Sequence, residues 1–268
     1  MLRQSAKAVL RAAGFNRERV AASRMVIERT ALASLPRKSA NRQTGRILAY
    51  HSVGQPRTGV NDVSIERFER QLDLAAELGF EFVPASQIAA THGTAKQLAI
   101  TVDDAWTSVA ENIAPILRKR KIPWTLFVVS GWSSQTDEWT QKDILHWNDL
   151  KELMDDDLEI GSHSVNHPDF AKLTVEQTQF ELEASRAAIT ENLGIDPTSF
   201  AIPYGQSSNW HATAQELAKK AGYDTIYSQA ERTAFPGTVR RTFVTKFDND
   251  RIFKALLNGA FDNWEEWV

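Results

Sequence analysis

The chain has 268 residues, 42% of them hydrophobic, and carries a formal net charge of −3. This length suffices for one large α/β domain or two small ones. No cysteine is present, which excludes disulfides, thiolate metal ligands and a cysteine nucleophile, so any bound metal must be held by histidine, aspartate or glutamate.

The charge is unevenly distributed along the chain. Residues 1–46 hold eleven basic and two acidic side chains, a balance of +9, which leaves −12 for the remainder. Helical patterns span about residues 5–13 and 17–35, so we predict a basic helical extension over residues 1–45, followed by a barrel domain over residues 46–268. Such an extension could bind an anionic membrane surface or dock against the acidic body.

No stretch of 18 apolar residues is present, so no membrane-spanning helix is predicted. A secretory signal is not predicted either, because Arg11 interrupts the short apolar run at residues 8–10. We therefore predict a cytoplasmic location, with peripheral membrane contact through residues 1–45 as the alternative. No nucleic-acid partner is predicted, and the sequence leaves the oligomeric state open.

After residue 46, apolar runs alternate with amphipathic stretches. The helix predicted at 64–78 has Ser64 as its N-cap, and the long helix at 174–193 lies between a Thr174 cap and Gly194. Another predicted helix follows Asp104 and ends at about residue 119. The remaining predicted helices cover 148–154, 211–221 and 251–257. The predicted strands cover 46–53, 80–84, 98–102, 124–129, 158–161, 200–203, 223–227 and 241–245. Residues 130–145 are predicted to form a loop.

Strands that alternate with helices predict an α/β fold with a parallel sheet. Polar, chemistry-bearing segments follow three of the predicted strands, at residues 101–104 (TVDD), 162–168 (SHSVNHP) and 201–205 (AIPYG). Catalytic groups at the carboxyl ends of several strands favour a barrel over an open sheet with a single switch point.

These segments contain the residue types of a metal-dependent hydrolase. His163 and His167 are four residues apart, and on a helical turn that spacing would put both imidazoles on one face, where they can share an ion. Asp103 and Asp104 end an apolar strand, where one carboxylate can face the ion and the other a bound water; a helix cap is the alternative for each. A zinc ion on two histidines and one aspartate would activate a water molecule, with the second aspartate as general base.

Taken together, the segments resemble the motifs of the NodB-type polysaccharide deacetylases, a carbohydrate esterase group, over about residues 46–246. TVDD resembles the first motif, SHSVNHP the second and IPYG the third, and the pair Tyr50-His51 on the first strand is also typical of many members. The resemblance implies a distorted (β/α)7 barrel that hydrolyses an N-acetyl or O-acetyl group on a sugar or polysaccharide and releases acetate.

The resemblance also implies a role for individual residues. Asp103 would be the catalytic base, and the backbone N–H of Tyr204 would bind the oxyanion. The divalent metal ion, with zinc first and cobalt or nickel as alternatives, would be held by Asp104, His163 and His167.

Three positions depart from the family pattern. Ala105 stands where the first motif usually ends in glycine, and Ala201 stands where the third motif usually carries an arginine that orients the base. The late histidine that commonly serves as general acid has no counterpart, so His51 is our candidate for a catalytic role in its place; the alternative is a hydrogen-bonded structural histidine.

The predicted substrate contacts are largely aromatic. Trp106 and Trp132 lie in or near predicted rim loops, where indole faces could stack on sugar rings, and Pro203 and Tyr204 of the third motif would border the same site. Packing within the core is the alternative for each tryptophan. Two other functions stay open: hydrolysis of a small amide or cyclic ureide on the same barrel, and carbohydrate binding with little catalysis. A site that only binds carbohydrate would not need the second carboxylate, that of Asp103.

Overall fold

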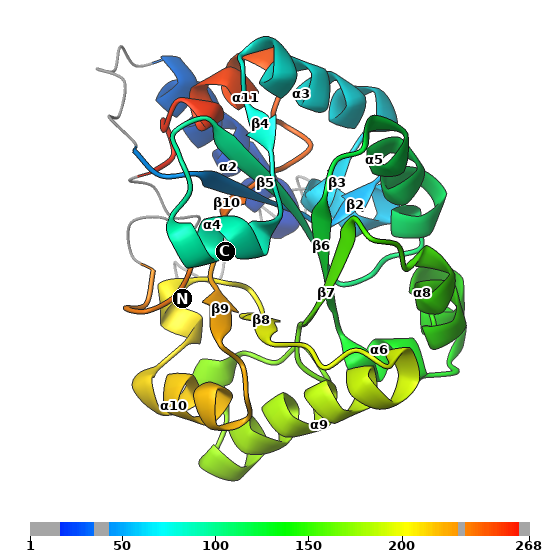
Figure 1. The fold of residues 1–268 in the computed structure, drawn as a ribbon. Helices are drawn as coiled ribbons and strands as arrows, with labels where there is room; N and C mark the ends of the chain where they lie inside the picture. The colour runs from blue at the N-terminus through cyan, green and yellow to red at the C-terminus, as the bar shows by residue number, and fades with distance from the viewer. Residues whose placement is uncertain (1–16, 35–42, 230–233, 263–268) are drawn as a thin grey trace, which may run out of the picture.

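The computed structural model describes residues 17–34, 43–229 and 234–262 (Figure 1). Its centre is a parallel sheet with the strand order β10-β1-β5-β6-β7-β8-β9, and β4 pairs with the start of β5. The strands are β1 (Arg46–Tyr50), β4 (Glu81–Phe82), β5 (Gln97–Asp103), β6 (Trp124–Val128), β7 (Leu158–Ser162), β8 (Ser199–Ala201), β9 (Thr225–Tyr227) and β10 (Thr242–Phe243). The predicted α/β barrel is confirmed.

Helices surround the sheet on its outer side (Figure 1). They are α2 (Arg17–Ser34), α3 (Ile65–Glu77), α4 (Ala85–Thr91), α5 (Ala114–Arg120), α6 (Ser130–Ser134), α7 (Glu138–Asp143), α8 (Trp147–Leu153), α9 (Val175–Leu193), α10 (Ala212–Lys220) and α11 (Asp250–Leu257). Short 3-10 or π turns are η1 (Pro56–Asn61), η2 (Val109–Ile113), η3 (Phe170–Lys172) and η4 (Ser207–Asn209). The helix predicted at residues 5–13 lies outside the described residues.

Local sequence signals account for the best-defined helices. The Ser64 hydroxyl accepts a hydrogen bond from the Arg67 N–H at the start of α3. Thr174 and Gln177 form a capping box at the start of α9, and Gly194 ends that helix with a left-handed φ of 71°. The predicted bounds of α3 and α9 are confirmed to within one residue.

Apolar strand residues pack together inside the barrel. Ile47, Ala99, Phe127, Ala201 and Tyr227 form a buried cluster there. The neighbour of Phe127 on β7 is Gly161, where an added Cβ would lie 2.4 Å from the Phe127 ring. Apolar side chains therefore pack the middle of the barrel beneath the site, and the polar groups of the site lie at the carboxyl ends of the strands.

A short segment closes the barrel between its first and last strands. On one side, β10 pairs with β1 through Leu48↔Thr242 and Ala49↔Phe243. On the other side, Tyr227 of β9 forms an isolated parallel bridge with Val239. We refer to residues 239–243 as the closing segment; closure by so few ladder contacts is what makes the barrel distorted.

The predictions for one strand and one loop were wrong. The strand predicted at 46–53 ends at Tyr50, and β2 (Ser52–Val53) instead pairs with β3 (Asp62–Val63) in a separate two-stranded sheet. The loop predicted at 130–145 contains α6 and α7, because Asp137 caps α7 by accepting hydrogen bonds from two backbone N–H groups of its first turn. The short helix α4 was not predicted.

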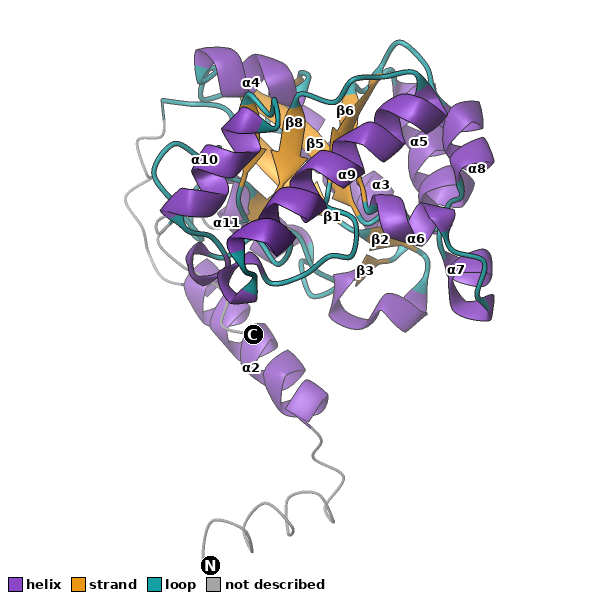
Figure 2. Ribbon diagram, turned by 90° about the horizontal axis from the view of Figure 1, so that it is seen from below, coloured by secondary structure: helices purple, strands orange, loops and turns teal. Residues whose placement is uncertain are grey.

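The basic extension is partly docked on the barrel. Helix α2, which matches the prediction for 17–35, packs against α11, and Figure 2 shows it projecting from that side of the barrel. Its Arg29 is 1% exposed and binds both carboxylate oxygens of Asp248, which follows β10, at 2.7 and 2.8 Å. Arg29 also donates to the carbonyl of Phe243 at 2.9 Å. Within the described residues, no helix is both long and apolar enough to span a membrane.

Candidate active site

The two adjacent aspartates lie where β5 ends. Asp103 is the last residue of the strand and is 1% exposed, and Asp104 follows it with a left-handed φ of 75°. Ala105 is also left-handed, with a φ of 61°. The chain therefore turns sharply here, which separates the two carboxylates and accounts for the glycine that the family usually has at the position of Ala105.

The two histidines are brought together by an irregular loop, so the predicted helical turn was wrong. The loop follows β7, and its bends come from left-handed φ angles of 69° at Ser164 and 54° at His167. The Ser164 hydroxyl accepts a hydrogen bond from the His167 N–H at 2.9 Å. The imidazole rings of His163 and His167 meet edge to face with their centroids 4.8 Å apart.

A buried carboxylate from α9 holds the middle of this loop. Glu181 is 6% exposed and accepts hydrogen bonds from the backbone N–H groups of Val165 and Asn166, both at 2.9 Å. Sequence reasoning missed this residue; the available signal was an acidic side chain on the face of α9 that also carries the buried Leu182 and Ser185.

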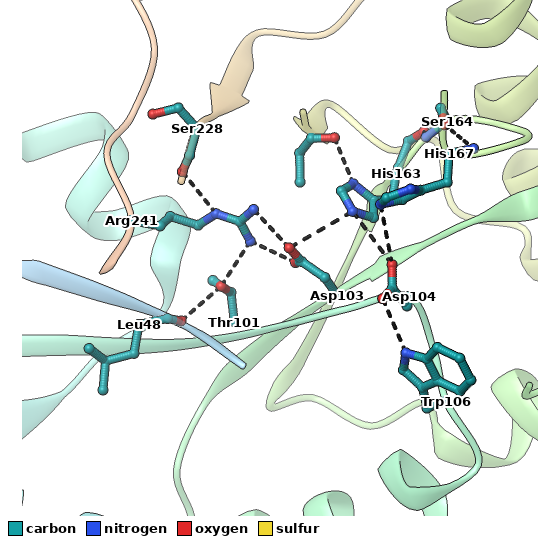
Figure 3. Close-up of polar contacts among 12 residues, drawn as sticks. Leu48, Thr101, Asp103, Asp104, Trp106, His163, Ser164, His167, Ser228 and Arg241 are labelled. Atoms are coloured by element: carbon teal, nitrogen blue, oxygen red, sulfur yellow. Dashed lines mark hydrogen bonds and ion pairs between the residues drawn. The ribbon is translucent and has the colours of Figure 1, made fainter. Parts of the chain in front are cut away.

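The sequence-predicted ligands converge on one point (Figure 3). Asp104 Oδ1 lies 3.6 Å from His163 Nε2 and 3.7 Å from His167 Nε2, and ligand atoms of the three residues all lie within 4.8 Å of one another. Asp104 Oδ1 is buried, yet it has no hydrogen-bond partner among the described residues. Two imidazole nitrogens and an unpaired carboxylate oxygen at this spacing fit a divalent metal ion of the zinc type.

The protonation state of His163 suits a metal ligand. Its Nδ1 lies 2.8 Å from the Ala201 carbonyl oxygen, which can only accept, so Nδ1 carries the proton and the Nε2 lone pair is free to bind an ion on the side of Asp104. Burial lowers the pKa of His163 to about 4, against the opposing effect of Asp103. The imidazole is therefore neutral at pH 7.

Asp103 is clamped by an arginine from the closing segment, which sequence reasoning missed. Arg241 Nη1 and Nη2 donate to the two Asp103 carboxylate oxygens at 2.6 and 2.9 Å. The guanidinium is also held by the Thr101 hydroxyl at 3.1 Å and the Ser228 carbonyl at 3.2 Å (Figure 3). An arginine directed at the predicted base is thus present, although position 201 lacks one.

This clamp determines the charge of the predicted base. Burial alone would raise the pKa of Asp103, but the positive charge and hydrogen bonds of Arg241 lower it to about 2. Asp103 is therefore a carboxylate throughout the physiological range and can accept a proton.

Replacing Arg241 with lysine is expected to lower kcat by roughly 10- to 100-fold with little change in KM, because lysine keeps the charge but cannot hold both carboxylate oxygens. Fewer hydrogen bonds raise the pKa of Asp103, so activity should disappear at a higher pH as the solution is acidified. A pH profile of kcat/KM measures both effects. The matched control is Arg240→Lys at the exposed neighbouring position; an unchanged acid limb in Arg241→Lys would contradict the role of the clamp.

The other predicted catalytic residues border this cluster. Tyr204 is 51% exposed, with a left-handed φ of 63°, and its ring meets that of His167 at 4.8 Å. Pro203 beside it is buried. His51 is buried against Phe243, with ring centroids 5.3 Å apart, and its Nδ1 has no hydrogen-bond partner among the described residues. Their predicted roles stay predictions.

The predicted sugar-stacking tryptophans lie against the metal-ligand candidates. The Trp106 indole N–H donates to Asp104 Oδ2 at 3.1 Å (Figure 3). Trp132 of α6 stacks on His167, with centroids 5.5 Å apart and planes inclined by 29°. Trp139 of α7 meets the rings of both other tryptophans edge to face and is 38% exposed. We refer to these three residues as the tryptophan cluster.

Comparison with known proteins relates this chain to polysaccharide deacetylases. The sequence model of the family described as polysaccharide deacetylase matches residues 90–226, just over half of the chain. The peptidoglycan-N-acetylglucosamine deacetylase PgdA of Listeria monocytogenes is 22% identical over 158 residues, which cover 58% of this chain and 30% of that protein. Across three curated relatives, the match covers between 30% and 66% of the relative's own length.

Solved structures show the same fold. The Streptococcus pyogenes deacetylase PplD has a TM-score of 0.67 at 19% identity, and the alignment covers 80% of this chain and 96% of that one. IcaB from Ammonifex degensii has a TM-score of 0.66 at 24% identity, with 81% and 97% covered. At these identities the likeness concerns the architecture, which agrees with the distorted (β/α)7 barrel.

Proposed function

The chain belongs to the polysaccharide deacetylase family, and from that premise we propose that it is a metal-dependent hydrolase that removes an acetyl group from an N-acetylated or O-acetylated sugar or polysaccharide. The family supports a hydrolase of carbon–nitrogen bonds acting on a carbohydrate. The metal, the roles of individual residues and the substrate are parts of our proposal.

The observation that carries the proposal is the buried Oδ1 of Asp104, which lies between two imidazole nitrogens without a hydrogen-bond partner in the described part of the chain. A second carboxylate that is already ionised, that of Asp103, lies directly beside it. A structural cap would pair the Oδ1 of Asp104 with a backbone N–H. Asp104, His163 and His167 would hold zinc, with cobalt or nickel as alternatives, and the ion when bound would lower the pKa of a water ligand and polarise the acetyl carbonyl.

The surrounding residues would then divide the remaining work. Asp103, held by Arg241, accepts the proton of the attacking water. The backbone N–H of Tyr204, which has no acceptor among the described residues, donates to the oxygen that becomes negatively charged. His51, whose Nδ1 has no hydrogen-bond partner among the described residues, would donate a proton to the leaving group in place of the family's late histidine.

Removing the metal is expected to abolish acetate release from acetylated chito-oligosaccharides and to leave the fold intact. The protein would be treated with a strong chelator, dialysed, and assayed before and after one equivalent of zinc, cobalt or nickel is added. Activity that returns with the ion supports the proposal, whereas full activity in protein shown by elemental analysis to be metal-free would refute it.

The same assay separates the alternative functions. A protein that binds zinc and hydrolyses small amides or cyclic ureides but no acetylated sugar would be the small-substrate hydrolase. A protein that binds sugar and never releases acetate would be a carbohydrate-binding relative.

For the basic extension we propose peripheral contact with an anionic membrane by a cytoplasmic protein. The excess positive charge of residues 1–46 supports this proposal. Arg29 would not take part, because it is buried against Asp248. Sedimentation with anionic liposomes, compared with neutral liposomes, tests the proposal.

A further inference from the structure

The tryptophan cluster offers a role that differs from sugar stacking. An indole N–H can only donate, and the acceptor for that of Trp106 is Asp104 Oδ2 at 3.1 Å. The other oxygen of the same carboxylate, Oδ1, is the one that faces His163 and His167. The hydrogen bond from Trp106 therefore fixes which oxygen of Asp104 faces the two imidazoles.

The position of Trp106 is itself fixed by its surroundings. The two left-handed residues before it, Asp104 and Ala105, turn the chain so that its side chain can reach back to the carboxylate. Trp106 forms an antiparallel bridge with Ile144, and the Leu145 N–H donates to the Ala105 carbonyl at 2.9 Å. A half-buried indole held in this way is suited to orienting a neighbouring carboxylate.

The second member of the cluster supports another ligand candidate. Trp132 lies nearly parallel to the imidazole of His167. Its helix is tied to the histidine loop by two backbone hydrogen bonds, from Ser130 N–H to the Ser164 carbonyl at 3.1 Å and from Gly131 N–H to the Val165 carbonyl at 2.9 Å. The rings of Trp106 and Trp132 also meet, with centroids 6.3 Å apart. The cluster thus contacts two of the three ligand candidates.

We propose that Trp106 is a positioning residue for the metal site, because its indole N–H turns Asp104 Oδ1 toward the ion, and that Trp132 supports the His167 ring. This inference rests on the proposed function only in that the site binds a divalent metal. It explains a polar contact that a sugar-stacking residue would not need, and it leaves Trp139, the most exposed ring of the cluster, for contact with substrate.

The decisive measurement is metal affinity, independent of turnover. Apoproteins of wild type, Trp106→Phe and the control Trp139→Phe would be titrated with zinc in competition with a chromophoric chelator, and the unfolding midpoint of each apoprotein would be measured. We expect Trp106→Phe to bind zinc roughly 10- to 100-fold more weakly than wild type, at an unchanged unfolding midpoint, because outer partners of metal ligands have effects of this size. Trp139→Phe should bind zinc as wild type does.

A second measurement needs no variant. In wild-type protein labelled with ¹⁵N at the tryptophan indoles, zinc should shift the resonance of one indole N–H far more than the others. Wild-type zinc affinity in Trp106→Phe together with a raised KM for chito-oligosaccharides would overturn the inference and restore the sugar-stacking role. Indole resonances that zinc leaves unmoved would also overturn it, whereas wild-type protein that binds no zinc would refute the proposed function itself.

Discussion

Replacing Asp103 with asparagine is expected to lower kcat for deacetylation by about 10²- to 10⁴-fold while zinc binding stays intact. Asparagine has nearly the same shape, so one of its side-chain atoms can still accept from Arg241. It cannot accept a proton from water at neutral pH, because an amide is not a base. The loss should therefore appear in kcat, measured as acetate release at saturating chito-oligosaccharide.

The matched variant at the neighbouring position should behave differently. Asp104→Asn removes the charge of the oxygen that faces both histidines, so we expect it to lose zinc as well as activity. Zinc content measured on both variants separates the two roles. Substantial activity in Asp103→Asn would mean that another group is the base, and loss of zinc from Asp103→Asn would place it among the ligands.

Replacing Arg29 with methionine is expected to lower the free energy of unfolding by about 3–5 kcal/mol, because it leaves the fully buried Asp248 carboxylate without its counter-ion. Burial already raises the pKa of Asp248, and Arg29 works against that rise. Without Arg29 the pKa of Asp248 rises further, so the folded state takes up a proton more readily. The deficit should therefore be large at pH 7 and smaller as the pH approaches about 4.

Denaturant unfolding at the two pH values tests this expectation. Arg24→Met on the same helix is the control, because its ion pair with Glu28 is largely exposed and its loss should cost less than about 1 kcal/mol. Equal effects of Arg24→Met and Arg29→Met would show that α2 contributes little to the barrel. A deficit that is independent of pH would show that the buried charge of Asp248 is not its cause.

The ligand candidates were predictable because a parallel sheet gathers the carboxyl ends of its strands. Asp104 follows β5, which carries a clear apolar run at residues 98–100, and His163 follows β7, where Leu158 and Ile160 flank Glu159. Once the alternation of strands and helices was recognised, their convergence followed from geometry alone. Local patterns thus indicated the fold and a metal site, and the resemblance to the polysaccharide deacetylase motifs distinguished Asp104 as a ligand from Asp103 as the base.

The contacts that were missed depend on distant parts of the chain. Arg241 reaches Asp103 because the closing segment lies between β1 and β9, and no local pattern of a two-residue strand reveals its partners. The available signal was a charged residue two positions before the apolar pair Phe243-Val244. The shape of the histidine loop was missed for a related reason: the spacing of His163 and His167 fits a helix, but the left-handed residues within the loop produce a different turn.

The left-handed backbone around the site also limits which sequences can occupy it. Asp104, Ala105, Ser164, His167 and Tyr204 all have positive φ angles, a conformation that costs roughly 1–2 kcal/mol per residue and is least accessible to β-branched side chains. Valine, isoleucine or threonine is therefore disfavoured at all five positions. At position 105, whose side chain is a single methyl group, intolerance of substitution would reflect the shape of the turn and not a chemical role.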